Sequence, residues 1–462
     1  MIETQAIPAS WREFNVLVFG ASGFTGKEVM RLVYCPPANS AQLITAPLFI
    51  LPFSWAICGR SESKLKNSLT EVTSETSCES GAAVDPTVLV ADVADRDLLI
   101  ATFRRTALVL NCSGPYRFLG EPVVEACIAA GADYMDISGE PQFMEDMFLK
   151  YHEQAKAART LIIHACAFDS VPADLGVLLT TRHFDRDCCN SISSFLTINS
   201  GPSGFAGHYT TFECAVHGFS DVESLRSIRK KIAEKFNIPA LKPPGPVAAK
   251  RPTFFYDANE KKYAMTFMGA DASVVRSSHR SLKERGILDL CAPQYSAFVT
   301  VPSLLYLGVI LVFGFVMQFL AGFSWGRTLL LKYPGLFTNG VFSHKGPSKE
   351  QLQSTSFKMT LYGIGFNAPD SNDPPVVVGR KYNDEPPANQ KKVVRVVIEG
   401  PEPGYVATPI FLVALANCLR VERADMPAGG VVTPAAAFHD SESIFKRLNA
   451  AGIKISAYKI KK

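Results

Sequence analysis

The sequence lacks several of the patterns by which functional classes are recognised. Its 11 cysteines form no C-x-x-C pair and fit none of the zinc-ligand spacings, and its 8 histidines form no cluster that supports a metal site. No G-x-S-x-G nucleophile motif and no internal repeat occur. The 47 Lys and Arg residues are nearly balanced by 43 Asp and Glu residues, and no nucleic-acid-binding motif is present. We therefore expect no metal site and no nucleic-acid partner.

Targeting signals are also sparse. The odd number of cysteines and the absence of a signal peptide favour reduced thiols in a cytosol-facing compartment. Glu3 and Glu13, with one arginine before Phe14, do not make the Arg-rich, acid-poor helix of a mitochondrial presequence. The length of 462 residues suggests two or three domains with a sizeable core.

An apolar run, a glycine-rich loop and a helical pattern follow one another over residues 14–34. Glycines at the start, middle and end of the loop permit a tight turn, close approach of a pyrophosphate and close packing of the helix on the strand. The free N–H groups that open the helix favour phosphate. The residues expected to bind the cofactor here are Gly20, Ala21, Ser22, Gly23, Phe24, Thr25 and Gly26. Such a turn can be purely structural, but the rest of the N-terminal third favours a dinucleotide.

Strands and helices continue to alternate up to about residue 180. Further strands are expected at Trp55–Cys58, Thr87–Ala91, Ala107–Cys112, Tyr134–Ile137 and Leu161–Ala165. Helices are expected at Glu62–Leu69, Asp95–Arg105, Glu121–Ala130 and Gln142–Ala158, with another from near Ala173. This alternation predicts an α/β fold with a doubly wound parallel sheet of the Rossmann type. In such a sheet the residues that follow each strand form the candidate site.

The residues after the second strand favour NADP over NAD, although NAD is possible. Arg60, with Ser61 and Lys64, offers a guanidinium to a 2′-phosphate, where an acidic residue would repel it. Arg60 is alternatively an exposed charge at a strand end. Asp92 and Val93, after the third strand, are expected to flank the adenine, and Asp92 alternatively caps the next helix.

The turn after the fourth strand is expected to pass the nicotinamide end of the cofactor. It begins at Asn111, and its expected cofactor-binding residues are Cys112, Ser113, Gly114 and Pro115.

Several motifs resemble those of the saccharopine dehydrogenase-like oxidoreductases. They are the loop at residues 20–26, YMDISGE at 134–140, CAFDSVPADLG at 166–176, GHYTTFE at 207–213, KGPS at 345–348, GPEPGYVATP at 400–409 and GGVVTP at 429–434. The resemblance covers most of the chain and is greatest to plant members described as probable mitochondrial proteins. It implies an NAD(P)-binding Rossmann domain, an α+β domain and oxidoreductase activity. Saccharopine-forming enzymes and bacterial trans-acting enoyl reductases are relatives, so it does not imply a substrate.

The second domain is expected to contain an antiparallel or mixed sheet. We assign residues 1–180 to the Rossmann domain and residues 181–462 to an α+β domain for substrate or interaction. Strands of the second domain are expected at Ser191–Asn199, Ser273–Arg276, Phe357–Ile364 and Val393–Glu399. Residues 367–392, rich in Pro, Asp, Asn and Lys, are expected to form a mobile hairpin loop. The basic helix expected at Leu225–Lys235 faces solvent or, alternatively, an anionic membrane surface.

Residues 290–326 contain no charged side chain, and the hydrophobic segment within them is 298–323. Its apolar centre, 304–320, would reach roughly 25 Å as a helix, at the lower limit for a membrane span. A single span would put the strands before and after it on opposite sides of the membrane. We therefore expect insertion into one face of a membrane or lipid monolayer, the alternatives being burial in the core or in a homodimer interface. A second apolar stretch, 43–53, is a surface insertion or an error of the gene model.

These features predict an NADP-dependent oxidoreductase that transfers hydride to a carbonyl, imine or enoyl group. The substrate is expected to be a small or lipid-linked molecule, and the location a lipid droplet or organelle surface, with the mitochondrion possible by family resemblance. Proton donors are sought among polar groups at strand ends and domain junctions. The candidates are Tyr116, Asp136, Glu140, Asp169 and His208, each of which also has a structural alternative. Tyr405 and Thr408 are further candidates to contact substrate from the second domain, or are structural turn residues.

Two other classes of function remain open. One is a Rossmann-fold protein of membranes or lipid droplets that binds cofactor without turnover, and the other is a non-catalytic NADPH sensor. The intact turn from Asn111 to Tyr116 favours an enzyme.

Overall fold

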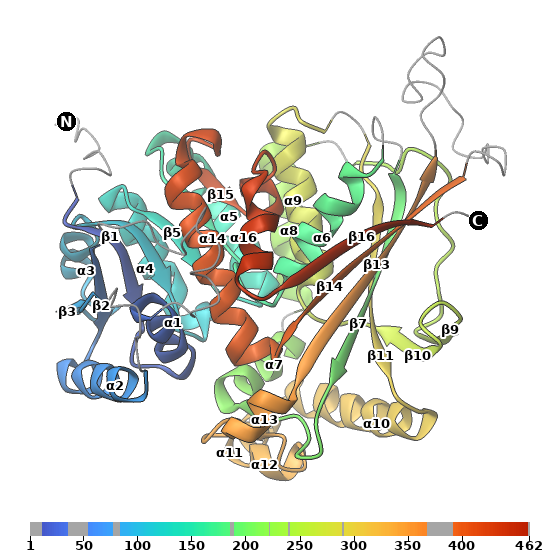
Figure 1. Cartoon of the computed structure of the whole chain (residues 1–462), viewed down its shortest axis with the longest axis horizontal. Coiled ribbons are helices and arrows are strands. Elements are labelled where there is room, and N and C mark those ends of the chain that lie inside the picture. The colour runs from blue at the N-terminus through green and yellow to red at the C-terminus, as the bar shows by residue number, and fades with distance from the viewer. Residues whose placement is uncertain are drawn as a thin grey trace. The chain divides into compact units, whose positions relative to one another are not determined.

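The computed structural model describes residues 12–35, 54–76, 84–184, 189–220, 222–238, 241–288, 291–366 and 391–460. The chain forms two compact units, whose elements are labelled in Figure 1. Unit 1 contains Met1–Asp169 and Pro403–Ile453, and unit 2 contains Ser170–Glu402 and Lys454–Lys462. The insertion at 43–53 and the expected mobile loop, apart from its last two residues, lie outside the described residues.

Unit 1 is built around a seven-stranded sheet whose neighbouring strands are all parallel, in the order β15-β6-β5-β4-β1-β2-β3. Its strands are β1 (Phe14–Phe19), β2 (Trp55–Gly59), β3 (Thr87–Val90), β4 (Thr106–Asn111), β5 (Asp133–Asp136), β6 (Leu161–Ile163) and β15 (Gly430–Val432). Its helices are α1 (Phe24–Tyr34), α2 (Glu62–Glu75), α3 (Arg96–Phe103), α4 (Tyr116–Ala130), α5 (Pro141–Ala157), the π-helix η4 (Pro403–Ala407), α14 (Thr408–Glu422), the 3₁₀-helix η5 (Arg423–Asp425), α15 (Pro434–Ala437) and α16 (Ser443–Ala450). The predicted Rossmann-type sheet is confirmed.

The centre of this sheet explains its apolar sequence. Val16, Leu17 and Val18 of β1 are fully buried, as expected for a parallel strand covered on both faces. In Figure 1, α14, drawn in red, lies beside the blue and cyan elements of unit 1, and it contacts α1. Segments from the end of the chain therefore complete the unit that the N-terminal part begins.

Unit 2 contains a second seven-stranded sheet in the order β16-β14-β13-β7-β11-β10-β9. Its strands are β7 (Cys189–Asn199), β9 (Phe254–Asp257), β10 (Lys262–Thr266), β11 (Gln294–Val301), β13 (Ser356–Phe366), β14 (Lys391–Pro401) and β16 (Lys454–Ile460), with β8 (Gly207–His208) and β12 (Phe342–Ser343) paired separately. Its helices are α6 (Val171–Arg182), α7 (Tyr209–Ser220), α8 (Val222–Phe236), α9 (Asp271–Glu284), α10 (Leu304–Ala321), α11 (Ser324–Lys332), α12 (Pro334–Phe337) and α13 (Lys349–Ser354). Because β7 is parallel to β11 and antiparallel to β13, the sheet is mixed.

One predicted strand is wrong. Residues 273–276 lie within α9, because Val274, Ser278 and Leu282 recur at helical spacing and are buried along one face.

The two units also differ from the division expected at residue 180. The helix α6 belongs to unit 2, where a side chain at Gly176 would lie 2.9 Å from Leu361 of β13. Residues 403–453 belong to unit 1, so the chain enters unit 2 and then returns.

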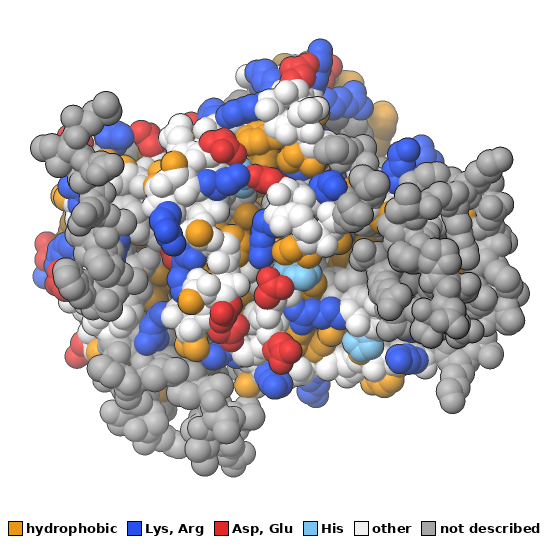
Figure 2. All heavy atoms as spheres, turned by 90° about the horizontal axis from the view of Figure 1, so that it is seen from above, with side chains coloured by type: hydrophobic (Ala, Val, Ile, Leu, Met, Phe, Trp, Pro, Cys, Tyr) orange, Lys and Arg blue, Asp and Glu red, His pale blue; other side chains and the backbone are white. Residues whose placement is uncertain are grey.

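Charged side chains of both signs are mixed on the face of the molecule shown in Figure 2. Ion pairs among the described residues include Arg96–Glu125 and Lys150–Glu121. The expected basic helix is α8 (Val222–Phe236).

Candidate functional site

The glycine loop between β1 and α1 has the geometry of a phosphate-binding loop. Gly20 adopts a positive φ of 78°, and a side chain there would lie 2.2 Å from the Ser113 hydroxyl. Gly23 is the N-cap of α1 and has no side chain to occupy the free N–H groups. A side chain at Gly26 would lie 2.2 Å from the carbonyl oxygen of Gly20. The first N–H groups of α1 are therefore left open to an anion, and the loop needs glycine at both ends.

Two cations at the end of β2 have no partner among the described residues. Arg60 and Lys64 are both exposed, and neither has a hydrogen bond or an ion pair there. The nearby Lys66 is instead paired with Glu62. Ser61 is the N-cap of α2 and accepts a hydrogen bond from the Lys64 N–H. This end of β2 can therefore bind a phosphate group without first breaking an ion pair.

At the end of β3, the alternative role expected for Asp92, that of capping the next helix, is wrong. Asp95, rather than Asp92, caps α3 by accepting a hydrogen bond from the Leu98 N–H at 3.0 Å. Asp92 accepts from the Ala94 N–H and shapes the turn that also contains Val93.

Asn111 fixes the turn after β4. Its Oδ1 accepts from the Ser113 N–H at 2.9 Å, and its Nδ2 donates to the Tyr134 hydroxyl at 3.1 Å. The Tyr116 hydroxyl donates to the carbonyl oxygen of Asn111 at 2.7 Å. Burial raises the Tyr116 pKa well above its ordinary value, so this phenol stays protonated and serves to hold the turn.

The Cys112 thiol in this turn stays protonated at neutral pH. Burial and the charge of Asp136 raise the Cys112 pKa to about 12. Eight cysteines of the described residues are free, whereas Cys35 is disulfide-bonded, so the expectation of reduced thiols is wrong for Cys35.

Asp136 joins the ends of β5 and β6. Its Oδ1 accepts from the N–H groups of Ser138 and Ala165, and its Oδ2 accepts from Tyr134 and His164. The His164 Nδ1 lies 2.6 Å from this carboxylate. Asp136 is fully buried and its carboxylate is fully bonded, which indicates an anchoring role.

The turn after β6 has an unusual backbone. Ala165 adopts a φ of 59°, a left-handed conformation that costs a non-glycine residue roughly 1–2 kcal/mol. Asp136 accepts from the N–H of Ala165 through its side chain and from that of Cys166 through its backbone oxygen. Because β5 thus holds the strained turn, the loop that follows has a defined position.

His164 is a residue of this region that the sequence-based candidates omit. It is 1% exposed, and its Nε2 has no hydrogen-bond partner in the described part of the chain. The sequence feature that could have identified His164 is its position directly after the apolar run of β6.

Glu140 anchors the start of α4. Its carboxylate accepts from the N–H groups of Tyr116 and Arg117 and from the Arg117 guanidinium at 2.9 Å. Glu140 is 4% exposed, so these bonds satisfy a buried charge.

Asp169 is different from these carboxylates. It is partly exposed, and no hydrogen bond or ion pair to it occurs within the described residues. A side chain at Gly139, beyond the end of β5, would lie 3.2 Å from its Oδ2. Burial raises its pKa from 3.8 to about 6, since the surroundings disfavour the charged form. Asp169 is therefore able to hold a proton close to neutral pH.

His208 lies in unit 2, on β8. Its Nδ1 accepts from the Thr210 N–H at 3.2 Å. Burial, together with neighbouring His344, lowers its pKa, so the imidazole is neutral at pH 7.

Tyr405 and Thr408 belong to unit 1 rather than to the expected second domain. The Tyr405 ring meets that of Phe24 edge to face, with centroids 4.8 Å apart. The Thr408 hydroxyl accepts from the Phe168 N–H at 3.3 Å. Both residues therefore contact loops of the candidate site.

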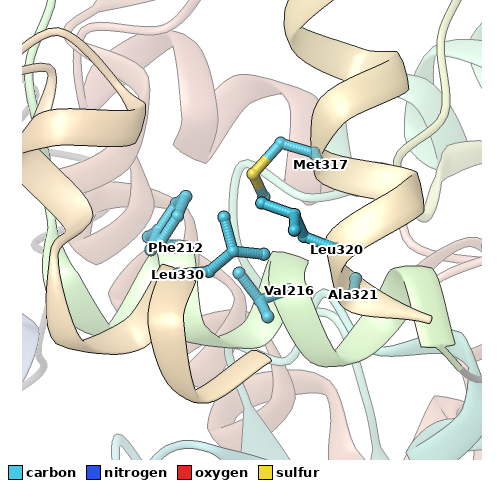
Figure 3. Close-up of a cluster of buried hydrophobic side chains, with 6 residues drawn as sticks. All are labelled: Phe212, Val216, Met317, Leu320, Ala321 and Leu330. Atoms are coloured by element: carbon cyan, nitrogen blue, oxygen red, sulfur yellow. The ribbon is translucent and has the colours of Figure 1, made fainter. Parts of the chain in front are cut away.

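The uncharged segment forms α10, which lies on the surface of unit 2. Figure 3 shows its buried side in contact with α7 and α11, through Phe212, Val216, Met317, Leu320, Ala321 and Leu330. A side chain at Gly326 of α11 would lie 2.1 Å from the Leu320 oxygen, so the two helices meet closely. The Arg327 guanidinium donates to the carbonyl oxygen of Ala321 at 2.8 Å and stabilises the same contact between α10 and α11.

The other side of α10 is apolar and exposed. Large apolar side chains that are at least half exposed are Leu304, Leu305, Tyr306, Val309, Val312, Phe315 and Phe319. By length and composition, α10 and the segment Pro403–Asp425 are the two described helices able to cross a membrane, and they are 17% and 72% buried. The second is thus a core helix. A single crossing by α10 is excluded by the sheet, because β11 before it and β13 after it both pair with β7.

Comparison with known proteins agrees with this geometry. Residues 16–163 match the family described as saccharopine dehydrogenase NADP binding domain, which confirms the NADP prediction. A human saccharopine dehydrogenase-like oxidoreductase is 38% identical, covering 96% of this chain and 97% of that protein. A probable mitochondrial saccharopine dehydrogenase-like oxidoreductase of Arabidopsis thaliana is 34% identical over 95% of each chain.

Two further matches are informative. A lipid droplet localized protein of Caenorhabditis elegans is 33% identical, covering 95% of this chain and 97% of that protein. The solved structure of saccharopine dehydrogenase (L-Glu forming) from Saccharomyces cerevisiae is similar in fold, with a TM-score of 0.54, 11% identity and coverage of 97% and 100%. Together with the parallel sheet and its glycine loop, these relatives show that the chain belongs to the saccharopine dehydrogenase-like oxidoreductases.

Proposed function

We propose that this oxidoreductase reduces a carbonyl, imine or enoyl group and that Asp169 donates the proton. The NADP cofactor supplies the hydride when bound. The observation that carries the proposal is the state of Asp169, which has a raised pKa, partial exposure and no bonded partner among the described residues. An acid with a pKa near the working pH donates protons efficiently.

The other candidates support this choice because their polar atoms are engaged or lack a proton to give. Asp136 and Glu140 are buried and bonded to several donors, and Tyr116 donates to the Asn111 carbonyl oxygen. His208 has a lowered pKa and is neutral at pH 7. In this proposal the first three hold the strand ends in place.

In this proposal the chain binds NADP through the ends of four strands, β1, β2, β3 and β4. The loop from Gly20 to Gly26 holds the pyrophosphate, and Arg60 and Lys64 hold the 2′-phosphate. The remaining contacts assigned to the cofactor are Ser61 beside the 2′-phosphate, Asp92 and Val93 beside the adenine, and Cys112, Ser113, Gly114 and Pro115 toward the nicotinamide. Unpaired cations at the end of β2 support a preference for NADPH over NADH.

The test of catalysis is NADPH oxidation measured by absorbance with imines, enoyl thioesters and lipid aldehydes. We expect turnover with one of these classes, and a loss of roughly a hundredfold to ten-thousandfold in Asp169→Asn with unchanged affinity for NADPH. Asp85→Asn, which changes an exposed carboxyl of unit 1, is the control. Full activity in Asp169→Asn would refute its role, and tight NADPH binding with no turnover would favour the sensor alternative.

We also propose that the enzyme works at a lipid monolayer or membrane surface, bound through the exposed side of α10. The name of the worm relative, lipid droplet localized protein, supports this location. Leu305, Val312 and Phe315 are 81%, 66% and 72% exposed, so lipid contact would remove a large apolar area from water. The helix α10 would lie along the lipid surface, and the substrate of the enzyme would be small or lipid-linked.

Flotation with phospholipid-coated oil droplets tests this location. Leu305→Asp, Val312→Asp and Phe315→Asp together should release the protein, because each charge costs about 2.5–3.5 kcal/mol in hydrocarbon. The matched control is Val247→Asp, at a valine that is 70% exposed outside α10. Release with an unchanged melting temperature is the expected result. A parent protein that stays off the droplets refutes the lipid surface, and a solution dimer broken by the same changes would assign α10 to a homodimer interface.

A further inference from the structure

The segment from Pro403 to Thr408 contacts two functional loops of unit 1. On one side the Tyr405 ring lies 4.8 Å from that of Phe24, at an interplanar angle of 80°. On the other side the Thr408 hydroxyl accepts from the Phe168 N–H at 3.3 Å. The same hydroxyl donates to the carbonyl oxygen of Pro403 at 3.0 Å. A single short segment thus connects the glycine loop with the loop after β6.

Each contact lies next to a group that the proposed reaction uses. Phe24 is the first residue of α1, where the free N–H groups meet phosphate. Phe168 directly precedes Asp169. Tyr405 and Thr408 are both buried, at 6% exposure each, so neither contact is a loose surface contact.

The backbone of this segment is also unusual. Residues Pro403–Ala407 form a π-helix, a rare geometry that is frequent at functional sites. It leads directly into α14, which contacts α1 and is buried over Phe411–Leu419. The segment is therefore anchored on a rigid core helix.

We propose that Tyr405 and Thr408 are positioning residues that transmit cofactor occupancy to the loop of Asp169. Tyr405 orders the phosphate-binding end of α1, and Thr408 orders the backbone before Asp169. The role of Asp169 rests on the proposed function, whereas the coupling between the two loops requires only that the cofactor binds.

Hydrogen–deuterium exchange with and without NADPH tests the coupling in the full chain. In the parent, NADPH should slow exchange at residues 20–27 and also at 164–169. Thr408→Val removes the hydroxyl at nearly constant volume, and it should abolish the slowing at 164–169 while keeping it at 20–27. Thr408→Ser keeps the hydroxyl and should behave as the parent. The expected effect at 164–169 is roughly twofold to tenfold, the range for one hydrogen bond.

A second measurement separates the two contacts. Tyr405→Leu should raise the Kd for NADPH by roughly twofold to tenfold, which is the range for an aromatic pair. Thr408→Val should leave this Kd within about twofold of the parent. If a turnover assay is established, Thr408→Val should also shift the alkaline limb of the pH–rate profile, where activity falls as the proton donor ionises, and Thr408→Ser should restore it.

The outcomes distinguish the two proposals. A parent that does not bind NADPH contradicts the proposed function itself. Binding of NADPH without slower exchange at 164–169, or equal slowing in Thr408→Val, overturns the coupling and leaves the function standing. Slower exchange that depends on the Thr408 hydroxyl supports the coupling.

Discussion

Replacement of Asp169 by asparagine should make unit 1 more stable at neutral pH. Burial raises the pKa of Asp169 from 3.8 to about 6. The folded state therefore binds the proton more tightly than the unfolded state, so this group opposes folding once it ionises. Each pKa unit corresponds to about 1.4 kcal/mol, which gives a cost of up to about 3 kcal/mol above pH 6. Asparagine has nearly the same shape and carries no charge, so it avoids this cost.

The sign of the pH dependence follows from the two pKa values. Below pH 3.8 both states are protonated, and Asp169 has no effect on the free energy of unfolding. As pH rises from 3.8 to about 6, the folded state loses stability relative to Asp169→Asn, and above that range the difference is constant. For a unit of this size, about 1 kcal/mol shifts the melting temperature by about 2–4 °C.

Differential scanning calorimetry of parent and variant at pH 4, 5, 6 and 8 measures this difference. We expect nearly equal melting temperatures at pH 4 and a variant about 6–12 °C more stable at pH 8. Asp85→Asn should show no such divergence, because that carboxyl is exposed. If the melting temperatures of the parent and Asp169→Asn change in parallel across this pH range, Asp169 is not held in a desolvated site. The proposal that Asp169 donates the proton would then lose its support.

Three further predictions test the cofactor site and the anchor at the start of α4. Arg60→Ala should remove most of the preference for NADPH over NADH, so the ratio of the two affinities measured by calorimetry should fall by roughly tenfold to a hundredfold. Lys66→Ala should leave this ratio unchanged, and equal affinities in the parent would refute a role for Arg60. Gly26→Ala should abolish cofactor binding or folding, because its side chain would lie 2.2 Å from a backbone oxygen, and normal binding would contradict the loop geometry. Glu140→Gln should destabilise the protein by about 3 kcal/mol because Arg117 loses its buried partner; unchanged thermal stability would argue against an anchoring role.

Elements with strong local signals were predictable from the sequence. The strand and loop at residues 14–26 match the structure because apolar residues and glycines specify them locally. Boundaries set by tertiary contacts were less predictable. The helix α2 continues beyond Leu69 to Glu75, where Glu71 and Glu75 pair with Lys27 and Arg31 of α1.

The sequence could not predict where in the fold an element lies when that element forms through contacts with distant residues. β15 has only three residues, and it forms by pairing with β6, more than 260 residues earlier in the chain. No local pattern assigns Gly430–Val432 to the parallel sheet. The same holds for Tyr405, whose motif indicates a turn but does not indicate that it meets Phe24.

The three candidate acids show most clearly which properties the sequence predicts and which ones only the structure reveals. Position near the end of a strand selected all three acids alike, because Asp136 ends β5, Glu140 follows β5 and Asp169 follows β6. Their chemistry differs because of partners that the sequence does not reveal: Asp136 accepts hydrogen bonds from two backbone N–H groups and two side chains, and Glu140 faces Arg117.

A carboxylate with several donors is stabilised in its charged form, whereas one that is desolvated without donors retains its proton. The first kind suits an anchor that must not change charge during turnover, and the second suits an acid that must give up a proton and regain it. Asp169 is of the second kind, and the strained turn at Ala165 that precedes it is held by a carboxylate of the first kind. The anchors at the end of β5 therefore support a precise position for the acid.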